Sequence, residues 1–173
     1  GAGHTLMDRL AEFPYIAMWV QAVRADTVGS VTTNMLGDPL VRYSLIREDV
    51  EKMRIGAHAL ARMHVEAGAE SILPGIQGMP YRISPDEVDM ILDAPLDPRN
   101  WFSALTHLFG GCVIGADPDR SVCNPNGEVR GVKGLIVSDA SQIPTTLGVN
   151  PQHTIMAMSR WRAHQLLDGE IGG

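Results

Sequence analysis

The chain has 173 residues, of which 45% are hydrophobic and 20% are charged, and its formal net charge is −6 at pH 7. This length suits one domain, or one domain with a piece of another, and the composition is ordinary for a globular protein. The negative balance argues against a nucleic-acid binder, which needs a basic face, and no apolar run approaches the ~20 residues of a membrane span.

Residues 1–6 are expected to form a flexible terminus. Apolar, β-branched and aromatic residues predict one or two strands over 13–24 and further strands over 28–34 and 40–45. A turn is expected between the last two strands at Gly37-Asp38-Pro39. These segments would pair most simply as an antiparallel meander.

The clearest helix is expected over residues 47–69, where apolar residues recur at spacings of three and four. Acidic residues in its first turns, Glu48 and Asp49, suit the positive end of the helix dipole. His58 and His64 also lie on this helix, but their spacing does not place them on one face, so structural roles are expected. No metal site is predicted in the chain.

A second helix is expected to begin at Ser84, because Pro85 and Glu87 follow it in the pattern of a capping box, and to end near Asp93. A short strand is expected before it, over residues 71–73.

The region after this helix predicts a strand, a long polar loop and a final strand and helix. Residues 101–107 are strand-like, residues 117–131 are loop-like, and Asn126-Gly127 is a strong tight-turn signal. A short apolar run over 135–137 predicts a buried strand. Asn150-Pro151 is expected to open the last helix, with Asn150 as N-cap, and that helix should run to about residue 168. A strand that enters a helix through a polar loop is a common place for a ligand in α/β proteins.

The two cysteines, Cys112 and Cys123, are too few for a disulfide framework and lack the paired spacing of a zinc site. Both are therefore expected to be free thiols. No secretory signal is visible, and a cytoplasmic location is expected.

Three runs in the second half carry a resemblance to a known family. They are His107-Leu-Phe-Gly-Gly-Cys-Val-Ile-Gly, the stretch from Ser121-Val-Cys-Asn-Pro-Asn-Gly to Asp139-Ala-Ser-Gln-Ile-Pro, and Gly148-Val-Asn-Pro-Gln-His-Thr-Ile-Met. In order, spacing and residue type they resemble the C-terminal region of the glucose–methanol–choline (GMC) oxidoreductases. The part before Thr106 resembles the substrate domain of that family more loosely.

The resemblance implies oxidation of the CH–OH group of an alcohol or sugar with FAD as cofactor. His107 would take the hydroxyl proton while hydride leaves for the flavin, and imidazole suits proton transfer near neutral pH. Asn150 would be the second member of the catalytic pair and would orient the hydroxyl, because an amide offers both a donor and an acceptor. The residues implied to contact the cofactor are Asp139, Ala140, Asn150, Pro151, Gln152 and His153.

The same resemblance implies an α+β fold. Residues 1–106 would form an antiparallel-sheet substrate domain with helices. Residues 107–173 would carry the catalytic pair and add the last strand and helix to a Rossmann-like FAD-binding domain. Its N-terminal part is absent here, because the chain has no Gly-x-Gly-x-x-Gly segment behind a strand. The partners expected are therefore a small alcohol or sugar and an N-terminal FAD-binding segment or chain, without which FAD should not bind tightly.

Several alternatives stay open at the level of sequence. The chain could be a fragment, one chain of a split enzyme, or an inactive relative. It could also belong to a hydroxynitrile-lyase type of protein, in which FAD is structural, or be a small interaction module.

Overall fold

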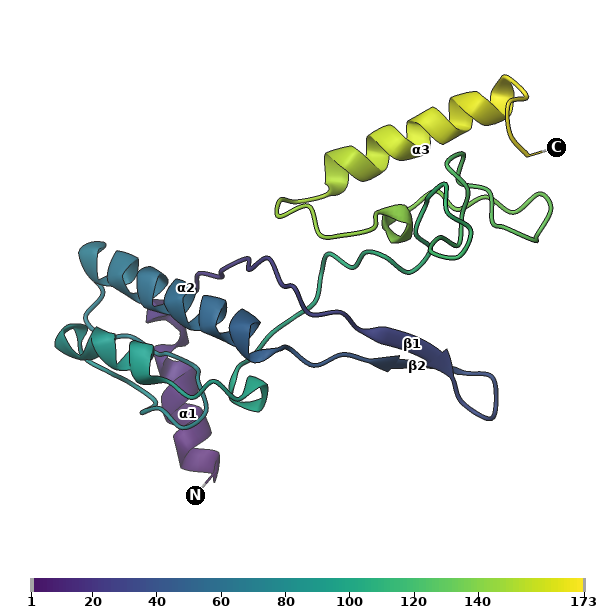
Figure 1. Ribbon diagram of the computed structural model, residues 1–173. Coiled ribbons are helices and arrows are strands. Elements are labelled where there is room, and N and C mark those ends of the chain that lie inside the picture. Colours follow the sequence, from purple (N-terminus) through teal and green to yellow (C-terminus); the bar gives the residue numbers. More distant parts are fainter. Residues whose placement is uncertain (1, 173) are drawn as a thin grey trace.

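The computed structural model describes residues 2–172, whose elements gather toward two ends of an elongated arrangement (Figure 1). Helices α1 (Ala2–Glu12) and α2 (Arg47–Glu66) lie at one end, and helix α3 (Gln152–Leu167) lies at the other. The architecture of the described residues is α+β, as predicted, with one sheet of two antiparallel strands.

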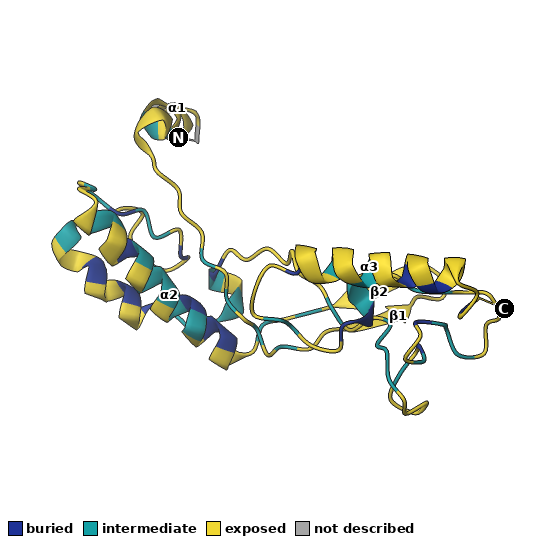
Figure 2. Cartoon of the chain, turned by 90° about the horizontal axis from the view of Figure 1, so that it is seen from above, coloured by how far each residue is buried: buried dark blue, intermediate teal, exposed yellow. Residues whose placement is uncertain are grey.

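Helix α2 confirms the predicted long helix and forms the centre of the main core. Val50 and Met53 on its inner face pack with Val88 and Ile91 of the 3-10 helix η2 (Pro85–Asp93). Buried residues concentrate along this helix and the segments that cover it (Figure 2). The other buried residues of the core are Ala61, Ile72, Ile76, Ile83, Ala94 and Trp101.

Helix η2 confirms the second predicted helix, although its hydrogen bonds follow the 3-10 pattern. Its start has the expected cap, because the Glu87 carboxylate accepts hydrogen bonds from the backbone N–H of Ser84 at 2.8 Å and from its hydroxyl at 2.9 Å. The short strand predicted over 71–73 is reduced to one bridge between Ile72 and Ile83.

The flexible terminus predicted over residues 1–6 is wrong where the structure describes it, because residues 2–6 already belong to helix α1. The guanidinium of Arg9 lies 3.3 Å from the centre of the Tyr81 ring, and Glu12 forms a 2.9 Å ion pair with Arg82. These contacts tie α1 to the loop before η2.

The prediction of one or two strands over residues 13–24 is also wrong. Residues 13–15 form a 3-10 turn, η1 (Phe13–Tyr15), and the chain from 16 to 29 has no regular secondary structure. A strand is defined by its ladder of hydrogen bonds, and no neighbouring segment among residues 2–172 supplies one.

The next two predicted strands do pair. Strands β1 (Ser30–Thr33) and β2 (Pro39–Arg42) form an antiparallel hairpin in which Val31 lies opposite Val41. Gly37 takes a φ of +87° in the connecting turn, a conformation that glycine adopts without a steric penalty. The predicted meander is therefore a two-stranded hairpin, and each of its eight strand residues is exposed.

Little regular structure precedes α3 in the second half. The 3-10 turns η3 (Pro98–Asn100) and η4 (Ala140–Gln142) interrupt long loops. The strands predicted over 101–107 and 135–137 do not form, and each region contributes a single bridge residue, Trp101 and Ile136. No helix among residues 2–172 has the length and apolar content needed to cross a bilayer.

Candidate functional site

The segment that follows His107 lies against the loop that contains Asp139 and Ala140. The N–H of Cys112 donates to the carbonyl of Ser141 at 2.9 Å, and the N–H of Ile114 donates to the carbonyl of Gln142 at 3.1 Å. Two stretches that the sequence analysis singled out separately are therefore neighbours in the fold.

The predicted tight turn at Asn126-Gly127 is confirmed and holds this region together. The N–H of Gly127 donates to the carbonyl of Asn124 at 2.9 Å, and the Asn124 side chain accepts from the N–H of Asn126 at 2.9 Å. The carbonyl of Gly127 accepts from the N–H of Val137 at 3.0 Å. The turn thus lies beside the segment that leads to Asp139.

Helix α3 is attached to this turn by a buried guanidinium. Arg162 is 1% exposed and donates to the carbonyl of Pro125 at 2.9 Å and to the side chain of Gln165 at 2.8 Å. A Cβ added to Gly127 would lie 2.6 Å from Nε of Arg162 and 2.6 Å from Nε2 of Gln142. Only glycine fits there, and its φ of +80° gives a second reason for that residue.

Asp139 serves first as a local cap. One of its carboxylate oxygens accepts from the N–H of Ser141 at 2.8 Å and from the Ser141 hydroxyl, which places Asp139 as the N-cap of η4. The carbonyl of Ser138 accepts from the hydroxyl of Ser159 in α3 at 2.9 Å. The loop with Asp139 and Ala140 is therefore held on helix α3.

The proposed catalytic pair lies on exposed chain. His107 and Asn150 are both exposed, and neither has a hydrogen bond or ion pair with another residue of 2–172. No hydrogen bond joins the two side chains, and both are accessible to solvent.

The start of α3 differs by one residue from the prediction. Pro151 occupies the N-cap position and no side chain caps the helix, so the expected cap role of Asn150 is wrong. Pro151 is buried, whereas Gln152 and His153 are exposed. Because the N–H groups of 152–154 find no acceptor among residues 2–172, the positive end of a sixteen-residue helix faces outward beside Asn150.

A groove that the sequence analysis did not predict lies between residues 21–26 and helix α2. It is open, has a volume of about 640 Å³, and includes Gln21, Arg24 and Lys52 in its walls. The side chain of Arg24 also reaches the loop before α3, where its Cδ is 3.5 Å from the position that a Cβ on Gly148 would take. Arg24 thus connects the first half of the chain with the loop that leads to Asn150.

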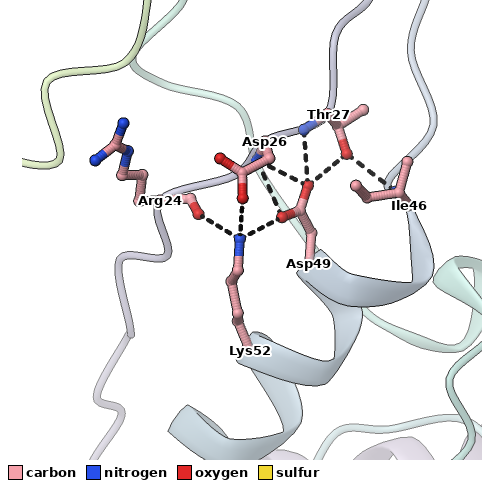
Figure 3. Close-up of polar contacts among 6 residues, drawn as sticks. All are labelled: Arg24, Asp26, Thr27, Ile46, Asp49 and Lys52. Atoms are coloured by element: carbon pink, nitrogen blue, oxygen red, sulfur yellow. Dashed lines mark hydrogen bonds and ion pairs between the residues drawn. The ribbon is translucent and has the colours of Figure 1, made fainter.

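Asp49 organises the wall of this groove (Figure 3). Its side chain is completely buried and accepts from the backbone N–H of Asp26 at 3.0 Å and of Thr27 at 2.9 Å, from the Thr27 hydroxyl, and from Nζ of Lys52 at 2.9 Å. Burial by itself would raise the pKa of Asp49, but these hydrogen bonds outweigh it and hold that pKa well below its ordinary value. From its position in the first turn, Asp49 was expected only to interact with the helix dipole.

The two histidines of α2 have structural contacts. The ring of His64 stacks on Trp19 with centroids 4.2 Å apart, and Nε2 of His58 lies 2.8 Å from the Asp89 carboxylate. Within residues 2–172, no three His, Cys, Asp or Glu side chains group in a way that could hold a metal ion. Cys112 and Cys123 are free thiols, as predicted.

Known proteins similar to this chain belong to one family. Residues 25–159 match the family model described as GMC oxidoreductase. The GMC-type oxidoreductase Rv0492c of Mycobacterium tuberculosis is 35% identical over 99% of this chain and 27% of its own length. The GMC-type oxidoreductase y4nJ of Sinorhizobium fredii is 37% identical over 79% of this chain and 27% of its own length.

A relative with a more specific name is the long-chain-alcohol oxidase FAO1 of Arabidopsis thaliana, which is 30% identical over 90% of this chain and 22% of its own length. The chain therefore spans only about a quarter of the length of the curated relatives that it matches.

Proposed function

The chain belongs to the GMC oxidoreductase family, and we propose that it supplies the substrate side and the catalytic pair of an enzyme that oxidises an alcohol with FAD. The observation that carries this proposal is the shared position of the three motif segments. The stretch after His107 pairs with the loop of Asp139 and Ala140, and that loop is held on helix α3, whose start follows Asn150.

In this proposal His107 removes the proton of the substrate hydroxyl. An exposed imidazole without a hydrogen-bond partner among residues 2–172 can form a hydrogen bond with an incoming alcohol. Asn150 has no titratable group, so its task is to orient the same oxygen through its amide donor and acceptor. The proton is then held on the imidazole of His107 as the carbon–hydrogen bond breaks.

The residues around the start of α3 fit the expected cofactor. The N–H groups of Gln152 and His153 are unpaired among residues 2–172 and lie at the positive end of the helix, which suits an acceptor that gains negative charge. Asn150 and Pro151 would complete this contact, and Asp139 and Ala140 would lie along the rest of the cofactor. When bound, FAD supplies the acceptor for the hydride of the alcohol.

The substrate that we propose is an apolar alcohol. FAO1 acts, by its name, on long-chain alcohols, and this similarity favours an apolar alcohol over a sugar. The oxygen that reacts would be a hydroxyl in either case, so the roles of His107 and Asn150 do not depend on the choice.

The experiment that tests these roles is turnover of a long-chain alcohol by the complete enzyme that contains this chain. Replacement His107→Ala should lower turnover by about 10² or more, because a positioned general base contributes at least that factor. The control is His164→Ala, which removes another exposed histidine in the last turn of α3. Equal rates in the two variants would remove His107 from the mechanism.

A further inference from the structure

The last helix holds a buried arginine that the proposed mechanism does not use. Arg162 of α3 is 1% exposed, and its guanidinium donates to the carbonyl of Pro125 at 2.9 Å and to the side chain of Gln165 at 2.8 Å. Both acceptors are neutral, and no carboxylate among residues 2–172 forms an ion pair with it. Arg162 is thus a buried cation without a buried anion.

The stability of the fold alone does not account for an arginine at this position. Its Nε has no hydrogen-bond partner within residues 2–172, and burial lowers the pKa of the guanidinium from its ordinary value. Buried charges in proteins are usually paired. Apolar side chains of similar volume often replace buried ion pairs without loss of stability, so an apolar residue would serve the fold as well here.

Arg162 lies where three segments of the second half meet. These segments are α3 itself, the tight turn of residues 124–127, and the 3-10 turn η4. Gln142 of η4 is completely buried and donates to the carbonyl of Val137 at 2.5 Å. The position that a Cβ on Gly127 would take lies 2.6 Å from Nε of Arg162 and 2.6 Å from Nε2 of Gln142. The absence of a side chain at Gly127 therefore lets both buried side chains reach the turn.

This junction joins the two segments that carry the groups expected around the cofactor. Asp139 caps η4, and Asn150 lies directly before the N-cap of α3. Because α3 is one continuous helix of sixteen residues, a contact in its second half also determines the direction of its start. A second contact, from the Ser159 hydroxyl to the carbonyl of Ser138 at 2.9 Å, comes three residues before Arg162 and thus from the same face of the helix.

We propose that Arg162 is a positioning residue for the reaction. By joining α3 to the turn of residues 124–127, it sets where Asn150 and the free N–H groups at the start of α3 stand relative to the flavin. The proposal rests on the function proposed above, in which these groups contact the substrate hydroxyl and the cofactor. A guanidinium suits this task because its N–H groups hold two acceptors at once, the Pro125 carbonyl on the turn and Gln165 on the helix. Arg162 acts through α3 and not by contact with the reacting atoms.

The test is Arg162→Met in the complete enzyme that contains this chain, since methionine removes the charge and both hydrogen bonds but fills the site flexibly. The reduction potential of the bound flavin should fall, because a displaced helix start stabilises the negative charge of the reduced flavin less. With an alcohol as substrate, kcat should fall about 10-fold or more while KM changes less than about twofold, because misplacement acts on the chemical step. The urea midpoint should stay close to that of the wild type, since removal of a buried charge offsets the lost hydrogen bonds.

Two further variants complete the comparison. Arg160→Met is the matched control, because it removes the same charge from the same helix at an exposed position, and it should keep the wild-type potential and kcat. Arg162→Lys keeps the charge but has one ammonium group in place of the fork, so its potential and kcat should fall between those of the wild type and Arg162→Met. If Arg162→Met does not fold, Arg162→Lys takes its place against the control. Equal potential and kcat at the two positions would overturn the proposal even if the urea midpoint fell, because the role of Arg162 would then be structural only.

The reduction potential is measured against a redox dye and needs no alcohol, so the two proposals can fail separately. An enzyme whose flavin potential depends on Arg162 but that oxidises no alcohol would keep Arg162 as a positioning residue and refute the proposed function. An enzyme that oxidises alcohols and keeps the wild-type potential and kcat in Arg162→Met would do the reverse.

Discussion

The buried carboxylate of Asp49 offers the sharpest test of how the first half of the chain is held together. Asp49→Asn keeps the shape of the side chain but replaces one acceptor oxygen with an NH₂ group. That group faces donors, because the backbone N–H groups of Asp26 and Thr27 and the Nζ of Lys52 all point at the carboxylate (Figure 3). At least one buried donor then loses its acceptor.

The expected loss follows from the number of hydrogen bonds affected. A buried polar group left without a partner costs roughly 1–3 kcal/mol, and hydrogen bonds to a charged acceptor are stronger than neutral ones. Asp49→Asn should therefore lower the free energy of unfolding by about 2–4 kcal/mol. This is a large fraction of the roughly 5–15 kcal/mol typical of a whole domain. The measurement is urea unfolding of the chain at pH 7, followed by circular dichroism.

Asp26→Asn is the matched control, because its carboxylate contacts the same Lys52 ammonium but is 63% exposed. Exposed ion pairs contribute little, so this variant should stay close to the wild type. Equal losses in the two variants would refute the role given to the buried carboxylate.

The same carboxylate predicts a dependence of stability on pH. The pKa of Asp49 in the folded chain is held below its value in the unfolded chain, which is near 4. The carboxylate therefore makes its full contribution to the free energy of unfolding above about pH 5. The contribution falls as acid protonates the unfolded state more readily than the folded one. Asp49→Asn should flatten this acid dependence. Part of the slope should remain because hydrogen bonds from Arg99 lower the pKa of Asp97 to about 2.

Three further predictions concern the second half and the edge of the core. Gly127→Ala should destabilise the chain by roughly 2–4 kcal/mol, because the new Cβ would overlap buried side chains and the residue has a positive φ. Gly131→Ala has a similar φ but open space around the new Cβ, so it should cost only about 1 kcal/mol. Urea unfolding of the two variants compares them. Iodoacetamide should label Cys112 well before Cys123 in intact-mass measurements, since Cys123 is fully buried and burial raises the pKa of its thiol; equal rates would contradict this packing. Trp101→Phe should lower the free energy of unfolding by about 1 kcal/mol, because the indole N–H donates to the carbonyl of Pro95 at 2.6 Å.

The elements that sequence predicts well are those whose signal is local. Helix α2 follows from apolar residues at spacings of three and four, and the cap of η2 follows from Ser84, Pro85 and Glu87. The turn at Asn126-Gly127 is equally local, because glycine supplies the positive φ that the turn requires.

The strands were harder to predict because a strand depends on a partner far away in sequence. Residues 16–25 have the alternation of a strand, and Trp19 and Gln21 do face α2, but no neighbouring segment of the chain pairs with their backbone. Residues 101–107 and 135–137 fail for the same reason and form single bridges. Hydrophobic pattern shows that a segment can be a strand, but not that its neighbour is present.

For the candidate site, the sequence predicts the residue types but not how the fold positions them. The residue types around His107 and Asn150 identify the family, and the family model covers both positions. Their geometry did not follow from sequence, because the connections pass through residues without a motif signal, such as Arg162 on α3 and Gln142 beneath the turn. The burial of Asp49 was missed because an acidic residue in the first turn of a helix usually remains exposed.

We propose that this chain provides the catalytic side of an alcohol-oxidising flavoenzyme, and anaerobic flavin reduction tests this proposal most directly. A long-chain alcohol mixed with the complete enzyme without oxygen should bleach the flavin absorbance, and His107→Ala should slow that bleaching by about 100-fold or more. Flavin that stays oxidised in the wild-type enzyme over the range of alcohols tested would contradict the claim.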